Sequence, residues 1–391
     1  MSILFLLLFL SSLLSSHPEV QAATLGSDIY ALKAFKTSIK PNSIPPWSCL
    51  GSWNFSIDPC SLPRRTSFIC GISCSPDSTR VTSLVLDPAG YSGTLTPLLS
   101  HLTQLIQLDL SDNSFYGPVP SSLSSLGNLK ILSLRSNAFS GNIPPSLTNL
   151  AFLQSLDISN NVLTGPLPVT MNSLSSLTTM DLSFNKLTGS LPRLPPNLVE
   201  LALKANSLSG LLSQSSFQGL TQLEVVELGA NRFTGAVQGW FFQLPSLQQV
   251  DLANNSFTAV EIQKPRNANN SELVAVDLGF NRIEGYLPLN LASFPLLASL
   301  SLRYNRFRGP IPWDYYKKVN DNSLRRLFLD GNFLNGKPPA GFFSGGSGSS
   351  VAGSFGDNCL ESCPASSQLC LSLQKPTSVC RQAYGGRIPL V

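Results

Sequence analysis

Histidine, methionine and charged residues are scarce in this chain of 391 residues. It has two histidines and three methionines, and Asp, Glu, Lys and Arg together make up 12 % of it. The sequence contains no G-x-S-x-G nucleophile elbow, no H-E-x-x-H zinc-binding helix and no phosphate-binding glycine loop. We therefore expect a protein that is not an enzyme and that uses no metal or cofactor.

Long hydrophobic runs are also missing, apart from one at the N-terminus. Residues 3–14 are apolar except for serines, and Val20-Gln21-Ala22 follows as a cleavage pattern. This predicts a signal peptide over residues 1–23, because a membrane span needs about twenty apolar residues. No later run could span a membrane or direct a lipid anchor. We expect a secreted, extracellular protein of the apoplast or cell wall, associated with the plasma membrane only through a partner.

The eight cysteines form two clusters of four, one near each end of the chain. They are Cys49, Cys60, Cys70 and Cys74, and then Cys359, Cys363, Cys370 and Cys380. An even number of cysteines behind a signal peptide predicts disulfide bonds, with three possible pairings in each cluster. Zinc is a weaker interpretation, because no histidine accompanies either cluster. Three glycosylation sequons, at Asn54, Asn254 and Asn269, fit an exported glycoprotein.

The chain is repetitive. Asparagine recurs at intervals of 21 to 27 residues, at Asn113, Asn137, Asn161, Asn185, Asn206, Asn231, Asn255, Asn281, Asn305 and Asn332. With Ala89 in the same slot one repeat earlier, this gives eleven repeats of the form x-L-x-L-x-x-N-x-L-x-G. The alternating leucines predict one short strand per repeat, stacked in parallel as a solenoid. We expect the asparagines to turn inward and bond the backbone of neighbouring repeats, so that Asn113→Leu would be destabilising.

The same pattern divides the chain. We predict an N-terminal cysteine cap over residues 24–80, beginning with a helix at residues 28–39, and a solenoid over 81–339. A Gly/Ser-rich linker over 340–358 and a C-terminal cysteine cap and tail over 359–391 follow. Residues 259–271 replace the usual end of the eighth repeat, and Trp313 to Lys318 lengthen the tenth.

A second signature follows the repeat glycine in Gly117-Pro-Val-Pro120, Gly141-Asn-Ile-Pro144 and Gly309-Pro-Ile-Pro312. With it, the chain resembles the plant-type extracellular leucine-rich-repeat family, whose repeat reads L-x-G-x-I-P. The segments Trp53 to Cys60, Cys70 to Cys74 and Ser354 to Leu360 resemble the caps of receptor-like proteins and receptor kinase ectodomains. Secreted polygalacturonase-inhibiting proteins are also similar. The resemblance implies an α/β repeat fold, a right-handed leucine-rich-repeat solenoid with a parallel concave sheet, a second short strand per repeat and disulfide-bonded caps.

Outward positions of the predicted concave strands carry the candidate binding residues. Most of these positions hold small or polar side chains, and large aromatic or arginine side chains there are typical of interface anchors. A column of carboxylates runs beside them. The predicted partner-binding set is Phe184, Asp251, Asp277, Phe280, Arg303, Tyr304, Arg326 and Phe328. The alternatives are rings packed on flanking loops and ordinary solvated strand polarity.

These patterns predict a recognition protein that binds a peptide, a protein or a receptor ectodomain on its concave face, in plant signalling or defence. One alternative is an inhibitor of pathogen cell-wall hydrolases. Another is a structural protein held on cell-wall polysaccharide by its mildly basic net charge of +4. That charge is too weak to favour nucleic acid as a partner.

Overall fold

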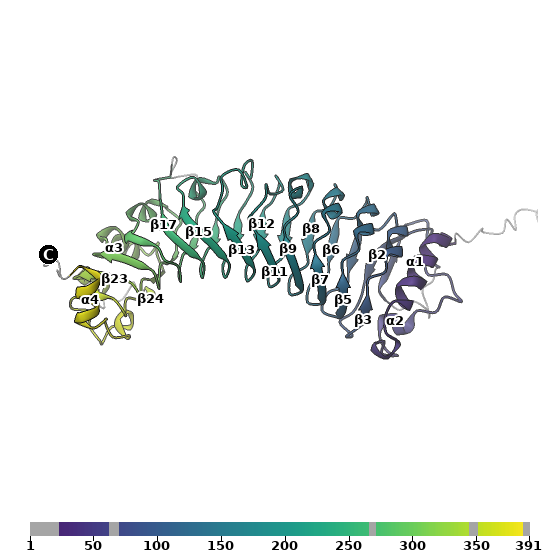
Figure 1. Cartoon of the computed structure of the whole chain (residues 1–391), viewed down its shortest axis with the longest axis horizontal. Coiled ribbons are helices and arrows are strands. Elements are labelled where there is room, and N and C mark those ends of the chain that lie inside the picture. Colours follow the sequence, from purple (N-terminus) through teal and green to yellow (C-terminus); the bar gives the residue numbers. More distant parts are fainter. Residues whose placement is uncertain (1–22, 62–69, 266–270, 344–350, 386–391) are drawn as a thin grey trace, which may run out of the picture.

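The protein forms an elongated, curved solenoid in which the chain advances steadily from one end to the other (Figure 1). The computed structural model describes residues 23–61, 70–265, 271–343 and 351–385. The sequon at Asn269 and almost all of the predicted signal peptide lie outside these ranges. Among the described residues, no helix has the length and apolar character needed to cross a bilayer.

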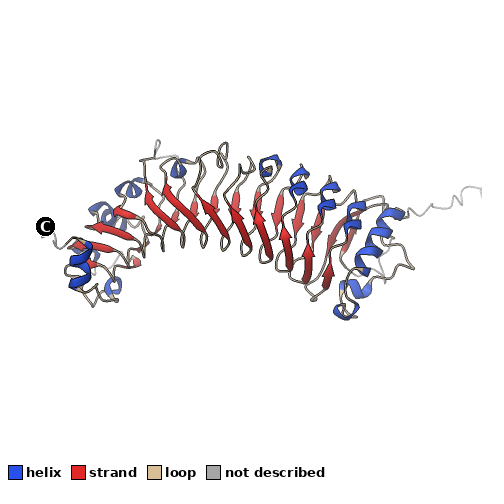
Figure 2. Cartoon of the chain, in the orientation of Figure 1, coloured by secondary structure: helices blue, strands red, loops and turns tan. Residues whose placement is uncertain are grey.

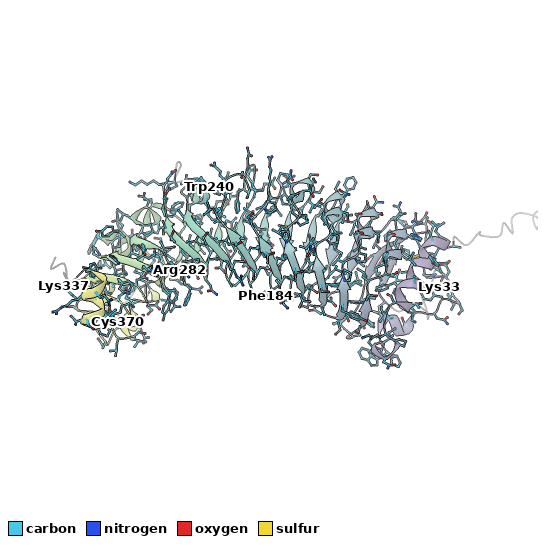
Figure 3. The ribbon with its side chains drawn as sticks, viewed as in Figure 1. Lys33, Phe184, Trp240, Arg282, Lys337 and Cys370 are labelled. Carbon is cyan, nitrogen blue, oxygen red and sulfur yellow. A yellow bond between two sulfur atoms is a disulfide. The ribbon has the colours of Figure 1, made fainter. Side chains whose placement is uncertain are left out.

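The largest sheet has 13 strands, in the order β1-β2-β4-β6-β8-β10-β12-β14-β16-β18-β20-β22-β24. Apart from β1 (Ile72–Cys74), which runs antiparallel to β2, all neighbours are parallel. The strands are β2 (Val81–Val85), β4 (Gln107–Asp109), β6 (Ile131–Ser133), β8 (Ser155–Asp157), β10 (Thr179–Asp181), β12 (Glu200–Ala202), β14 (Val225–Glu227), β16 (Gln249–Asp251), β18 (Ala275–Asp277), β20 (Ser299–Ser301), β22 (Arg326–Phe328) and β24 (Ala352–Ser354). We call this the concave sheet, because Phe184 at the end of β10 lies on the inner side of the arc in Figure 3.

The opposite, outer side of the arc carries short helices in place of strands (Figure 2). These are η2 (Pro97–His101), η3 (Ser121–Ser125), η4 (Pro145–Asn149), η5 (Met171–Ser173), η6 (Phe241–Gln243), η8 (Leu289–Ser293), α3 (Trp313–Asn320) and η9 (Ala340–Phe342). Helix α3 occupies the predicted lengthening of the tenth repeat. Its Lys318 is buried, and the ammonium group donates to the carbonyl oxygens of Phe294 and Pro295 at 2.9 and 3.3 Å.

Leucine and asparagine hold successive repeats together as the sequence predicted. Leu108 and Leu110 of the second repeat are fully buried. The Asn332 side chain is also fully buried, and its Nδ2 donates to the carbonyl oxygens of Leu302 and Leu329, each at 3.0 Å. Its Oδ1 accepts the amide of Phe307 at 3.1 Å. Every buried polar atom of this side chain is therefore satisfied, which is why a polar residue is tolerated in the core.

The asparagine ladder continues one step beyond the predicted repeats. Asn358 is fully buried and donates to the carbonyl of Leu329 at 3.0 Å, while β24 pairs with β22. The prediction that residues 352–358 belong to a linker was therefore wrong, because Ala352–Ser354 form a further concave strand and Asn358 continues the ladder. Asn358 follows Asn332 by 26 residues, which matches the spacing of the other repeats, but the Gly/Ser-rich composition before it is typical of a linker. Residues 344–350 of that prediction lie outside the described ranges.

A second strand in most repeats builds two lateral sheets. The first contains β3 (Ser92–Thr94), β5 (Ser114–Pro118), β7 (Ala138–Asn142), β9 (Val162–Pro166), β11 (Lys186–Gly189), β13 (Ser207–Gly210), β15 (Arg232–Val237) and β17 (Ser256–Val260). The second contains β19 (Glu284–Tyr286), β21 (Arg306–Gly309), β23 (Phe333–Gly336) and β25 (Cys359–Leu360). The boundary between them lies at the eighth repeat, whose end departs from the repeat sequence. The concave sheet crosses this point without interruption.

Disulfide bonds close both ends, which confirms the predicted bonding. The N-terminal cap contains α1 (Gly26–Thr37), η1 (Pro41–Ser43) and α2 (Cys49–Ser52), and its bonds Cys49–Cys70 and Cys60–Cys74 cross in sequence. The C-terminal cap contains η10 (Gln368–Cys370) and α4 (Thr377–Ala383), and its bond Cys359–Cys380 encloses Cys363–Cys370. Both caps cover the end of the hydrophobic core, as an open solenoid requires.

Candidate functional site

The edge of the concave face is shaped by a backbone conformation that the sequence did not reveal. The second residue after the concave strand's buried leucine position adopts a positive φ in repeat after repeat, including Phe184 and Phe280 (both 55°) and Tyr304 (50°). Residues other than glycine rarely adopt this conformation. Because it recurs at one slot, it places the three aromatic residues at equivalent positions along the edge of the sheet.

Glycine replaces the side chain at this slot in the eleventh repeat. A Cβ built on Gly331 would lie 2.5 Å from the ring of Tyr304. The ring therefore occupies the space that any larger residue would need. This close approach was not predicted, and it fixes Tyr304 between its own strand and the next.

Four predicted binding residues meet in one cluster, which we call the arginine–aromatic cluster: Phe280, Arg303, Tyr304 and Phe328. The rings of Phe280 and Tyr304 stack with centroids 4.7 Å apart. The Cζ of Arg303 lies 5.9, 5.5 and 5.2 Å from the ring centroids of Phe280, Tyr304 and Phe328. A guanidinium that lies near three aromatic rings is stabilised by cation–π attraction.

Asp330 holds this arginine in place. Its Oδ2 accepts hydrogen bonds from Arg303 Nη2 at 2.7 Å and from Nε at 3.2 Å. The Asp330 side chain is only 5 % exposed, against 33 % for Arg303. Its other oxygen, Oδ1, is buried with no hydrogen-bond partner among the described residues. Asp330 was not among the predicted binding residues, although it occupies the same slot as Arg303 in the next repeat.

A groove of about 400 Å³ lies beside the cluster on the concave face. It is lined by six of the eight predicted residues: Asp251, Asp277, Phe280, Arg303, Arg326 and Phe328. Carboxylates line the part of the groove over β14, β16 and β18, and the arginines line the part over β20 and β22. The groove can therefore hold a ligand that carries both positive and negative groups.

The carboxylates of this groove differ in their surroundings. Asp251 accepts a hydrogen bond from the Lys204 ammonium at 2.8 Å, which raises the pKa of the lysine. Burial raises the pKa of Asp277, although the amide of Gly279 donates to its Oδ1 at 2.8 Å and opposes the shift. The Asp277 carboxylate is therefore protonated more readily than an ordinary aspartate, because its pKa is raised.

The remaining predictions on this face have separate positions. Tyr304 does not line the groove but stacks on Phe280, which does. Phe184 lies four repeats away at the end of β10, 52 % exposed, and the structure does not bring it near the cluster. Asn254, a predicted glycosylation site, is exposed at the same positive-φ slot. The second sequon, Asn54, is also exposed and lies in the N-terminal cap.

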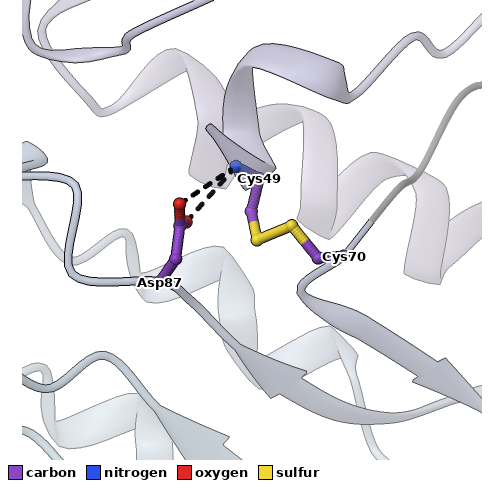
Figure 4. A group of neighbouring side chains, drawn as sticks. All are labelled: Cys49, Cys70 and Asp87. Carbon is purple, nitrogen blue, oxygen red and sulfur yellow. Dashed lines mark hydrogen bonds between the residues drawn. A yellow bond between two sulfur atoms is a disulfide. The ribbon is translucent and has the colours of Figure 1, made fainter. Parts of the chain in front are cut away.

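One group of described residues has the spacing of a metal site, but its chemistry does not fit. Cys49, Cys70 and Asp87 offer atoms within 4.8 Å of one another (Figure 4). Both sulfurs are joined in a disulfide, so neither is a thiolate that could bind a cation. Asp87 instead accepts the hydroxyl of Tyr91 at 2.6 Å and the amide of Cys49 at 3.3 Å. This carboxylate connects the cap to the first repeat.

Comparisons with known proteins agree with the repeat fold. A Leucine Rich Repeat family model matches residues 104–126, 128–150, 152–174 and 176–198, and a second Leucine rich repeat model matches residues 196–257. Receptor-like protein 7 of Arabidopsis thaliana is 31 % identical over 150 residues, which are 37 % of this chain and 14 % of that protein. This chain is a plant-type leucine-rich-repeat solenoid with disulfide-bonded caps.

Solved structures of the same type extend over more of this leucine-rich-repeat chain. A PEPR1–AtPEP1 crystal structure has a TM-score of 0.74 and 29 % identity, covering 86 % of this chain and 45 % of that one. The plant peptide hormone receptor RGFR1 in complex with RGF2 has a TM-score of 0.62 and 29 % identity, covering 69 % of this chain and 42 % of that one. The chain therefore spans less than half the length of these relatives. Its disulfides and its relatives fit an extracellular protein.

Proposed function

We propose that this leucine-rich-repeat protein is a secreted recognition protein that binds an extracellular peptide or protein in plant signalling or defence. The binding surface is the arginine–aromatic cluster together with the adjoining groove of the concave face. The similarity to a peptide hormone receptor in complex with its peptide supports a ligand-binding role. The proposal involves binding alone and no catalytic step.

The observation that carries the proposal is the fixed arrangement of Arg303 among exposed rings. Phe280 and Tyr304 are 49 % and 43 % exposed, which is unfavourable for stacked aromatic side chains unless a partner covers them. Tyrosine and arginine are over-represented among residues that dominate binding energy. Because Asp330 and Gly331 already hold these side chains, little conformational entropy remains to be lost on binding.

The polarity of the groove restricts the partner further. Asp251 and Asp277 form one part of the groove, and the exposed Arg326 lies in the other. A peptide or loop with both a basic and an acidic group would place each against its opposite charge. Electrostatic complementarity of this kind mainly sets orientation and specificity.

The first test is a pull-down from plant extracellular fluid and membranes, using the secreted chain expressed in an oxidising host. The Tyr304→Ala, Phe328→Ala double variant removes two rings of the cluster and leaves the asparagine ladder intact. Phe184→Ala is the matched control, because Phe184 has the same backbone conformation and comparable exposure outside the cluster. We expect a peptide or receptor ectodomain to be recovered by the parent chain and by the control, and lost in the double variant.

Other outcomes would contradict the proposal. Recovery that is equal in the double variant would show that the cluster is not the binding surface. Capture of a cell-wall hydrolase, with inhibition of its activity in extracts, would instead favour the inhibitor. Recovery of wall polysaccharide alone, released by salt, would favour a structural role, since salt screens exposed charge contacts.

A further inference from the structure

The second lateral sheet carries a recess that the concave-face proposal does not use. It has a volume of about 450 Å³ and is lined by residues of β19, β21 and β23 and by Tyr384 beside α4. Its side chains include Glu284, Tyr286, Arg308 and Asn335. These residues come from the ninth to eleventh repeats and from the C-terminal cap, so the recess exists only in the folded array.

Cross-strand pairing leaves one positive charge uncompensated in this recess. On the outer face of the sheet, Glu284 lies opposite Arg306, and the two form an ion pair at 3.0 Å. The next outward pair on the same two strands is Tyr286 and Arg308. Arg308 has no ion-pair partner within the described part of the chain, and the next strand places Phe333 beside it. The exposed Arg282 and Lys337, at the same end of the arc in Figure 3, add further positive charge.

The ring of Tyr384 contacts this guanidinium, and the ring of Tyr286 lines the same recess. The Cζ of Arg308 lies 5.9 Å from the ring centroid of Tyr384, whose hydroxyl donates to the carbonyl of Phe333 and accepts the amide of Gly309. Tyr286 is 78 % exposed, and its ring lies over Gly309, where a Cβ would meet it at 2.5 Å. The recess thus has an exposed aromatic ring with polar groups around it, and the backbone of Gly309 lies buried beneath that ring.

We propose that this recess binds a carboxylated sugar ring, as part of an acidic oligosaccharide. A sugar ring presents a C–H face that suits the exposed ring of Tyr286, and hydroxyls that suit Glu284 and Asn335. The uronate carboxylate matches the unpaired fork of Arg308, which can donate two parallel hydrogen bonds. An acidic peptide would also supply a carboxylate, but its side chain would leave the flat face of the Tyr286 ring without the C–H face that a sugar ring presents.

The test is isothermal titration calorimetry of the secreted chain with a uronic-acid trisaccharide. The same trisaccharide as its methyl ester, and an acidic peptide of equal charge, are the comparison ligands. Arg308→Gln and Tyr286→Ala remove the two proposed contacts, and Arg232→Gln is the matched control on the first lateral sheet, where Arg232 is exposed at the start of β15. Circular dichroism verifies that each variant is folded.

We expect the acidic trisaccharide to bind, the ester and the peptide to bind at least about tenfold more weakly, and each recess variant to lose about tenfold in affinity. Arg232→Gln and the Tyr304→Ala, Phe328→Ala variant should bind the sugar as the parent chain does. Absence of binding, equal binding of the ester, or an equal effect of Arg232→Gln would overturn the proposal. Stronger binding of the peptide would assign the recess to an acidic protein segment instead.

Discussion

The two lateral sheets are built from the same repeat yet present different chemistry to the solvent. Immediately before the repeat glycine, most strands of the first sheet hold small hydroxyl residues such as Ser140, Thr164, Thr188, Ser209 and Thr234, with Tyr116 of β5 as an exception. The same slot in the second sheet holds Glu284, Arg308 and Asn335. The inward residues that stack the repeats do not change between the sheets. Inward positions therefore determine the fold, and departures at outward positions show where the chemistry of the surface changes.

The concave face shows the same contrast. Arg135 and Arg303 occupy equivalent slots, but Arg135 pairs with the exposed Asp112 and Arg303 with the buried Asp330. Only Arg303 is surrounded by aromatic rings. Both candidate surfaces thus lie in the C-terminal half of the array.

The largest expected loss of stability tests whether the asparagine ladder is equally important near the two ends of the array. Asn332→Leu leaves several buried backbone groups without partners and should cost about 4 kcal/mol of unfolding free energy. Asn113→Leu removes similar bonds, but Asn113 is only half-buried, and its loss should cost about 2 kcal/mol because water can replace some of them. Urea denaturation followed by circular dichroism measures both. Equal losses of unfolding free energy in the two variants would contradict the view that burial determines how much each asparagine stabilises the array.

The next comparison is between the caps. Removing Cys60–Cys74 with a paired serine substitution should cost about 3 kcal/mol. Removing Cys363–Cys370 should cost about 0.6 kcal/mol less, since its loop spans 7 residues against 14. Hydrogen exchange should show each end of the array opening first when its own bond is absent. Uniform opening along the array would argue against end capping.

The two arginines give a smaller but sharper contrast. Arg303→Met leaves the buried carboxylate of Asp330 unpaired and should cost about 2 kcal/mol at neutral pH, less than a fully buried pair would, because Arg303 retains solvent contact. Arg135→Met should cost at most about 0.5 kcal/mol, since that pair is exposed. Thermal melting compares them. Adding Asp330→Asn should recover most of the loss in the first case, and failure to do so would place the effect in packing.

The smallest expected effect is a pH dependence of stability, and it should have the same sign in the N-terminal and C-terminal halves of the array. Burial raises the pKa of Asp157 and of Asp277 above the ordinary value of 3.8. The folded protein therefore binds these protons more readily than the unfolded chain, so stability rises as the pH falls from neutrality through the raised pKa values. Asp157→Asn and Asp277→Asn should each remove less than about 1 kcal/mol of that gain. Thermal melting of both variants at pH 7 and in mild acid tests this. Changes of opposite sign in the two variants would contradict the expectation that the two regions behave alike.

Much of the fold could be predicted because leucine and asparagine at this period can all be buried together in a parallel-stranded solenoid. The concave strands and the inward asparagines follow from side-chain alternation and from the need to satisfy buried amides. The further strand β24 was missed because a Gly/Ser-rich composition resembles a linker even when an asparagine such as Asn358 follows at repeat spacing. The disulfide pairing was not predictable, since spacing alone leaves three choices in each cap.

The candidate site was predictable only in its outline. Parity along the strands placed Phe280, Arg303 and Phe328 on one face. Parity could not show that the Tyr304 ring lies over Gly331 of the next repeat, or that Asp330 binds Arg303. These contacts depend on a positive φ and on the register between repeats. Phe184 satisfied the same pattern but lies too far away to join the cluster.

The boundary between the lateral sheets also has a mechanical consequence. Elsewhere, two hydrogen-bonded ladders, one concave and one lateral, resist bending of the rod. At the eighth repeat the concave ladder continues from Val250 to Val276, while β17 and β19 belong to separate sheets. The amide of Arg282 still donates to the carbonyl of Phe257 at 2.9 Å, but no paired strands among the described residues continue the lateral ladder here. Bending stiffness is lower where one of two parallel supports is weakened, so a force applied along the arc would be absorbed first at this hinge. Because the groove spans β14 to β22, the hinge lies within it, and flexing of the rod would change the groove's width directly.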